Sequence, residues 1–311
     1  MIFWDYIVIL NFLVASMGLT ANLAFFRLVV FCRAYDVYCR ISAFIISSGM
    51  TLMILSNICS IIMCLSYDSY FDSGPCGQTE SHILMVYLHA YGEFSIADGI
   101  FILIFERYAS VFLPSFRTSD IYKLCFLAGM SIHIMGLGTY LYLMVTVRSS
   151  FAILLGVSFI SSLFLISLVL AIYLICASKN KYYETLGLIS LTQRYMLAES
   201  YELCKSVLPA TFVTLTINIG ICFSAWLLLL GYILQDYFYE FFAIMNMIMN
   251  VDATLFPLLF LYGSKKIRKK ICKIAPFHLK LPQGIRQLNG HRISVSQSQN
   301  EYFDKLNSSW S

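Results

Sequence analysis

Long apolar segments alternate with short polar ones along nearly the whole chain. Each apolar segment exceeds the roughly 20 residues that a helix needs to cross a lipid bilayer. The segments are residues 6–31, 41–66, 82–108, 123–146, 152–176, 207–234 and 241–263. This pattern predicts an all-α fold, a bundle of seven transmembrane helices.

The positive charges predict the orientation of this bundle. If the N-terminus lies outside, the inner loops and helix ends hold all Lys and Arg residues except Arg148, which is one of 21. Positive residues near membrane helices favour the cytoplasmic side. We therefore expect an outer N-terminus, a cytoplasmic C-terminus and a multi-pass protein of the plasma membrane.

Composition and the end of the chain complete this outline. Hydrophobic residues make up 59% and charged residues 12% of the chain, compared with about 45–50% and about 25% in soluble domains. A basic amphipathic segment at 264–275 predicts a short helix at the surface of anionic lipids. We expect one transmembrane domain, residues 1–275, and a disordered cytoplasmic tail, residues 276–311.

The sequence gives no sign of catalysis or of a bound cofactor. It has no Gly-rich phosphate loop and no His-Glu-x-x-His motif, and its five His residues lack metal-ligand spacing. Glu93 and Asp98 lie about 140° apart around one helix, so they would not face a common substrate. We expect neither an enzyme nor a nucleic-acid-binding protein.

Cysteine usage offers one candidate disulfide. Cys76 lies in the outer segment 67–81, where the compartment is oxidising. If it forms a disulfide, its partner by depth is Cys64 at the outer end of the second span.

One group of polar residues falls at a common depth in the predicted bundle. At 1.5 Å per residue, its members lie about 13–17 Å from the inner ends of four spans. They are Asn22, Asp98, Asn218 and Asp252. Polar residues in a bilayer are costly unless they face the bundle interior. They are either hydrogen-bonding residues that hold helices together or a switching layer, in which Asp98 and Asp252 share a proton or bind a sodium ion.

A second polar group lies nearer the outside. His89 and Glu93 are spaced i, i+4 on the third span and can pair. Asn57, Trp226 and Asn246 lie at comparable or shallower depths on other spans. These five residues are candidates for a small-molecule site with apolar walls, and the alternative is a purely structural His–Glu pair.

The third span ends in Glu106-Arg107-Tyr108. An arginine at this position can simply anchor the helix at the membrane surface. The adjacent carboxylate suggests instead a charge pair that holds the helix end until a conformational change releases it. At the inner end of the third of seven spans, the tripeptide resembles the Glu/Asp-Arg-Tyr motif of G-protein-coupled receptors.

The inner segment before the sixth span extends this resemblance. Its sequence at 191–200 is Leu-Thr-Gln-Arg-Tyr-Met-Leu-Ala-Glu-Ser. It is similar to a conserved stretch of the nematode serpentine chemoreceptors of the Sra, Srab, Srb and Sre group, with Met196 and Ser200 in place of Gln and Asn. The resemblance implies a chemosensory receptor that binds a small molecule and activates a heterotrimeric G protein.

A transporter or channel that uses the polar layer as a pathway is the alternative. Internal repeats and broken helices would favour it, and the sequence has no evident repeat.

Overall fold

The computed structural model describes residues 2–31, 35–66, 79–113, 119–147, 150–184, 191–230, 238–264, 285–286 and 292–293. These residues form seven long helices, between 24 and 39 residues each, and one pair of very short strands. The helices are α1 (Ile2–Phe25, continued by the π-helix η1, Phe26–Phe31), α2 (Val37–Ser66), α3 (Glu80–Phe112), α5 (Asp120–Val147), α6 (Ser150–Glu184), α7 (Leu191–Leu229) and α8 (Phe238–Gly263). The predicted all-α, seven-helix bundle is confirmed.

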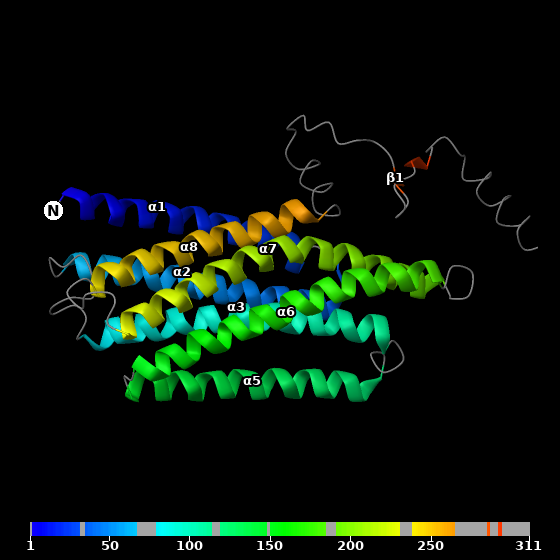
Figure 1. The fold of residues 1–311 in the computed structure, drawn as a ribbon, viewed down its shortest axis with the longest axis horizontal. Helices are drawn as coiled ribbons and strands as arrows, with labels where there is room; N and C mark the ends of the chain where they lie inside the picture. Colours follow the sequence, from blue (N-terminus) through cyan, green and yellow to red (C-terminus); the bar gives the residue numbers. More distant parts are fainter. Residues whose placement is uncertain are drawn as a thin grey trace, which may run out of the picture. The chain divides into compact units, whose positions relative to one another are not determined.

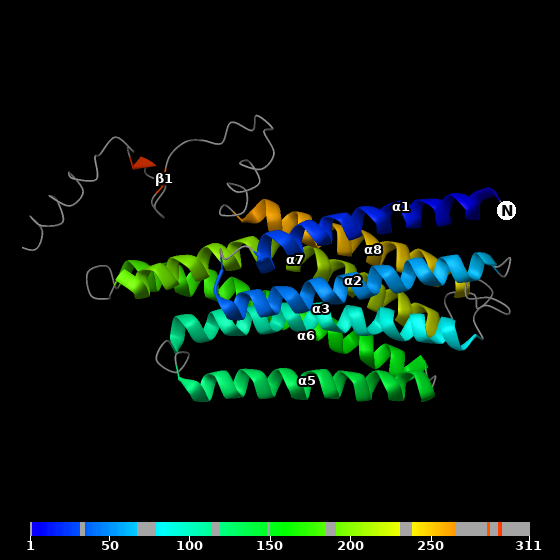
Figure 2. The same ribbon diagram turned by 180° about the vertical axis from the view of Figure 1, so that it is seen from behind.

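The helices run alternately up and down the bundle (Figure 1). The most extensive packing joins α2 to α3 and α6 to α7, and α8 packs against both α1 and α7. α5 lies at one edge of the bundle in both views (Figures 1 and 2). In this arrangement α3 has α2, α5, α6 and α7 as neighbours, so its side chains are well placed to connect other helices.

Glycine permits the close approach of α2 and α3. A Cβ atom added at Gly49 would lie 2.6 Å from the carbonyl oxygen of Gly92, and one added at Gly92 would lie 2.5 Å from that of Gly49. The two backbones therefore touch at this crossing. Small residues commonly allow such contact between membrane helices.

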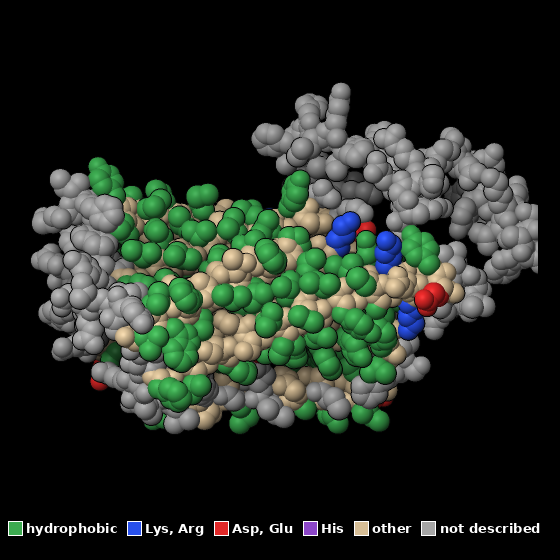
Figure 3. Space-filling model, in the orientation of Figure 1, with side chains coloured by type: hydrophobic (Ala, Val, Ile, Leu, Met, Phe, Trp, Pro, Cys, Tyr) green, Lys and Arg blue, Asp and Glu red, His purple; other side chains and the backbone are tan. Residues whose placement is uncertain are grey.

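The surface of the bundle is that of a membrane protein. Large apolar side chains such as Met17, Leu124 and Phe151 are more than 60% exposed, and apolar side chains cover the visible face of the helices (Figure 3). Lys and Arg side chains gather on this face near the end of α6 and the start of α7. Six of the described helices are long and apolar enough to cross a membrane. The direction in which the bundle crosses stays a prediction.

The predicted spans differ from the helices mainly at the inner side. Residues 191–200, expected in a loop, form the first turns of α7. The reason is amphipathicity: Leu197, Ser200, Leu203 and Cys204 are buried at helical spacing, while the intervening positions are polar enough to interrupt an apolar run. The helix therefore continues beyond the residues that hydropathy alone identifies.

The chain divides into two compact units, Met1–Arg268 and Lys269–Ser311. In the second unit, β1 (Ile285–Arg286) pairs antiparallel with β2 (Arg292–Ile293). The predicted domain boundary at 275 and all of the predicted surface helix except Ser264 lie outside the described residues. The disordered character of 276–311 also stays a prediction.

Candidate functional site

Arg107 stands at the centre of a charged cluster near the C-terminal end of α3, the end predicted to lie inside the cell. Its side chain is only 3% exposed, and the guanidinium group forms ion pairs with Glu106 and Asp36. Glu106 is fully buried. Removing either partner from a buried pair is strongly destabilising, because it leaves a charge without compensation. The predicted Glu106–Arg107 pair is therefore present, together with a second carboxylate.

Asp36 has two roles in this cluster. One carboxylate oxygen accepts a hydrogen bond from the backbone N–H of Cys39 at 2.8 Å, which caps the N-terminus of α2. The other oxygen pairs with Arg107. The same side chain thus caps the start of α2 and connects this helix to α3. Sequence reasoning missed Asp36, although an Asp directly before an apolar run is a recognisable capping signal.

Further contacts at this end join α3 to α6 and α7. The hydroxyl groups of Ser110 and Ser200 lie 2.9 Å apart, which links α3 to α7. Lys181 of α6 donates a hydrogen bond to the carbonyl oxygen of Val111 at 2.8 Å. Ser200 is the last residue of the motif that resembles the nematode receptors, so this motif contributes directly to the contact between α3 and α7.

The segment between α1 and α2 also contacts α8. The hydroxyl of Tyr35 lies 2.6 Å from that of Ser264, directly after α8. Burial raises the pKa of Tyr35 above its ordinary value, which keeps the phenol protonated and able to donate.

Tyr108, the third residue of the predicted motif, has different surroundings from Arg107. Its ring packs against Phe105 and Phe112, with centroids 6.4 and 4.8 Å away. Phe112 in turn stacks on Tyr173 of α6. Tyr108 thus belongs to an aromatic row along α3, in keeping with a packing role.

The predicted polar layer separates into groups. Asn22 of α1 donates to the carbonyl oxygen of Ser47 at 2.9 Å and to the hydroxyl of Thr51 at 2.7 Å. It also accepts from the Ser47 hydroxyl at 2.8 Å. All of these partners belong to α2, so Asn22 joins α1 to α2. Asp98 is buried in α3.

The remaining two members, Asn218 of α7 and Asp252 of α8, both contact Thr214 of α7. Thr214 of α7 donates to Asp252 of α8 at 2.8 Å, and Asn218 donates to the carbonyl oxygen of Thr214. The carboxyl group of Asp252 also interacts electrostatically with that of Glu93. The sequence analysis did not anticipate this pair of acids. A site shared by Asp98 and Asp252 stays a prediction.

Among the outer candidate residues, His89 is the one whose contacts to other helices are best defined. Its Nδ1 lies 3.2 Å from the carbonyl oxygen of Met53 in α2, and its Nε2 lies 3.3 Å from Met249 Sδ in α8. Asn57 is one turn from Met53 on α2, and Asn246 is one turn from Met249 on α8. The structure thus places four of the five predicted residues, Asn57, His89, Glu93 and Asn246, on helices that meet near this imidazole.

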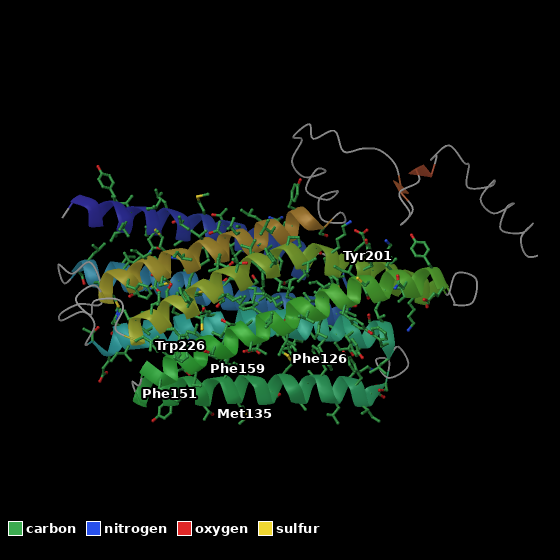
Figure 4. All side chains as sticks on the ribbon, in the orientation of Figure 1. Phe126, Met135, Phe151, Phe159, Tyr201 and Trp226 are labelled. Carbon is green, nitrogen blue, oxygen red and sulfur yellow. The ribbon has the colours of Figure 1, made fainter. Side chains whose placement is uncertain are left out.

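Trp226, the fifth predicted residue, lies on the half of α7 away from Tyr201 (Figure 4). It is 46% exposed. An indole at the outer end of a membrane helix is well suited to contact the lipid interface. Its part in a ligand site stays a prediction.

The candidate disulfide is only partly described. Cys64 is disulfide-bonded, and Cys76 lies outside the described residues. Cys64 Sγ lies 4.0 Å from Nδ1 of His82, which follows the N-cap Thr79 of α3. Among the described residues, no three His, Cys, Asp or Glu side chains are grouped to hold a metal ion.

A model of the Sre G protein-coupled chemoreceptor family matches residues 77–311 of this chain. The match covers more than half of the sequence and includes every described helix from α3 to α8. No curated protein matches the chain. Asp36 lies before the matched residues, whereas Arg107 and Ser200 lie within them.

Proposed function

We propose that this chain, which belongs to the Sre G protein-coupled chemoreceptor family, binds a small molecule in the outer half of its bundle and activates a heterotrimeric G protein at the inner end. The N-terminus then lies outside the plasma membrane. This assigns the residues around His89 to ligand binding, and the cluster around Arg107 to G-protein coupling.

The observation that carries this proposal is the double restraint on Arg107. Glu106 holds the guanidinium group from its own helix, and Asp36 holds it from the start of α2. A charged group buried at the inner surface can serve as a two-state switch, because its release changes which conformation is populated. In the restrained state, Arg107 is unavailable to a cytoplasmic partner.

α7 provides a physical connection between the two regions. Thr214 contacts Asp252 and Ser200 contacts Ser110. These two positions on α7 are about 21 Å apart at 1.5 Å per residue, on nearly the same face. Pro209 lies between them inside the helix, where it cannot donate the usual hydrogen bond and makes bending easier. A ligand-dependent change at Thr214 would thus move Ser200 relative to α3.

The decisive test is a G-protein readout in cells that express Arg107→Ala, with a panel of small molecules as agonists. We expect surface expression of the variant to fall, because Glu106 and Asp36 lose their partner, and signalling per receptor at the surface to be lost. Lys123→Ala is the matched control, because Lys123 is an exposed base of α5. Signalling of Arg107→Ala at the wild-type level would show that Arg107 is only an anchor.

The orientation needs a separate test. An epitope inserted after Phe3 should bind antibody on intact cells, whereas one after Asn300 should bind only after permeabilisation. The one-sided distribution of Lys and Arg is the reason. Reversed accessibility would place Arg107 outside and end the proposal.

A further inference from the structure

His89 and Glu93 lie on one face of α3, and the side chain of His89 reaches α8. His89 Nε2 contacts Met249 Sδ at 3.3 Å. Since α3 and α8 run in the same direction (Figure 1), one turn further along each helix brings Glu93 level with Asp252. The electrostatic interaction between these two carboxyl groups agrees with this register. Two acids from different helices thus lie at about the same level inside the bundle, near enough for their charges to interact.

A third oxygen acceptor lies on α7, one turn from the residue that contacts Asp252. Thr214 donates to Asp252 Oδ1, and Asn218 follows Thr214 by one turn on the same face. Asn218 is only 4% exposed. Its amide nitrogen donates to the backbone of Thr214, but within the described part of the chain its Oδ1 has no hydrogen-bond partner. A buried amide oxygen without a donor is costly, so a bound cation or N–H donor at this oxygen would stabilise the folded state.

We propose that Glu93, Asp252 and Asn218 bind one compact monovalent cation, either the ammonium group of a small organic amine or an alkali-metal ion. All three side chains offer oxygen acceptors, and a cation offsets the repulsion between the two carboxylates. A calcium ion is a poorer fit, since it takes 6–8 oxygen ligands and usually several carboxylates. This inference rests on the proposed function only where it names a small organic amine as the ligand.

This site differs from a sodium site between Asp98 and Asp252. Glu93 and Asp98 project about 140° apart around α3, so both cannot face Asp252 equally. Glu93, and not Asp98, lies on the same face of α3 as His89. Asp98→Asn is therefore a matched control, because it removes an acid from the same helix without touching the proposed site.

The test measures thermal unfolding of the purified full-length receptor in detergent at constant ionic strength. The probes are methylammonium chloride, sodium chloride and, as the bulky reference cation, N-methylglucamine chloride. We expect methylammonium or sodium to raise Tm by about 2–4 °C over the reference, as a ligand does when it binds only the folded state. Asp252→Asn and Glu93→Gln should each abolish this rise, and Asp98→Asn should keep it.

The Tm measured in N-methylglucamine shows whether a variant is still stably folded, so that a lost rise in Tm can be assigned to lost cation binding. In N-methylglucamine, Asp252→Asn should unfold at or above the wild-type Tm, because the substitution removes repulsion between two acids. A rise with methylammonium alone identifies an organic amine, and a rise with sodium alone identifies an inorganic ion. No rise with either, or a rise lost only in Asp98→Asn, overturns the proposal. G-protein coupling plays no part in this measurement, so its outcome is independent of the Arg107 test.

Discussion

The charged cluster around Arg107 differs from the buried amides of Asn57 and Asn218 in how far its polar groups are paired. At the inner end, Arg107 is paired with two carboxylates, and serine hydroxyls connect α3 to α7. In the outer half, within the described residues, the Nδ2 of Asn57 and the Oδ1 of Asn218 are buried without a hydrogen-bond partner. The charged groups around Arg107 are thus paired within the protein, although Arg40 Nε and Ser178 Oγ near the same end have no hydrogen-bond partner among the described residues. The amides of Asn57 and Asn218 are only partly paired.

This difference indicates where free energy is available for binding. A buried polar atom without a partner has already lost its water, so a ligand that supplies the missing hydrogen bond gains the full interaction. In the Arg107 cluster the same gain is made within the protein, and a partner must first displace existing contacts. The amides of Asn57 and Asn218 can therefore gain more from a bound ligand than the groups of this cluster.

The largest effect is expected where α2 and α3 cross, between the two ends. In Gly49→Ala the new methyl group would lie 2.6 Å from the carbonyl oxygen of Gly92 and 2.9 Å from Ser95 Cβ, distances that real Cβ atoms do not adopt. The helices must separate, so we expect most of the surface expression to be lost. Flow cytometry of tagged receptor measures this. Gly129→Ala is the control, because nothing lies within 4 Å of its added Cβ.

Opening the inner end is expected to give the next largest effect. Asp36→Asn keeps an N-cap for α2, since Asn caps as well as Asp, but removes the charge that holds Arg107. We expect basal G-protein signalling to rise by up to about tenfold, which corresponds to about 1.4 kcal/mol. Glu106→Gln should act in the same direction. Asp120→Asn removes an exposed acid and should change nothing; unchanged basal signalling in the Asp36 variant would disprove the restraint.

The smallest effect is expected from two buried asparagines, Asn22 and Asn57, which differ in how fully their amides are hydrogen-bonded. Asn22 is fully engaged with Ser47 and Thr51, whereas Asn57 has an unpaired amide nitrogen in the described structure. Asn22→Leu should lower Tm by a few degrees, since interhelical hydrogen bonds contribute about 0.6 kcal/mol each. Asn57→Leu should leave Tm unchanged or raise it, because it removes an unsatisfied donor. Equal losses of Tm in Asn22→Leu and Asn57→Leu would show that the two asparagines do not differ in their contribution to stability.

The sequence predicts the helices well because each apolar run is long and distinct. All seven runs correspond to helices, and the main discrepancy is the polar first part of α7. The charge pair Glu106–Arg107 was predictable because its residues are adjacent. Asp36 is 71 residues away from Arg107, and Glu93 and Asp252 come from helices far apart in the chain. Hydropathy and local motifs contain no information on such contacts, which depend on helix rotation and register.

Asp36 shows which partner moves when the inner end opens. Its carboxylate is fastened to the first turn of α2 through Cys39, and α2 is locked against α3 where Gly49 and Gly92 touch. The carboxylate of Asp36 is therefore held in place, whereas Arg107 has a long side chain that can rotate. Under the proposed function, activation would correspond to movement of the guanidinium group of Arg107 away from the fixed carboxylate of Asp36. A G protein that binds Arg107 would then need to offer only acceptors within the reach of one arginine side chain.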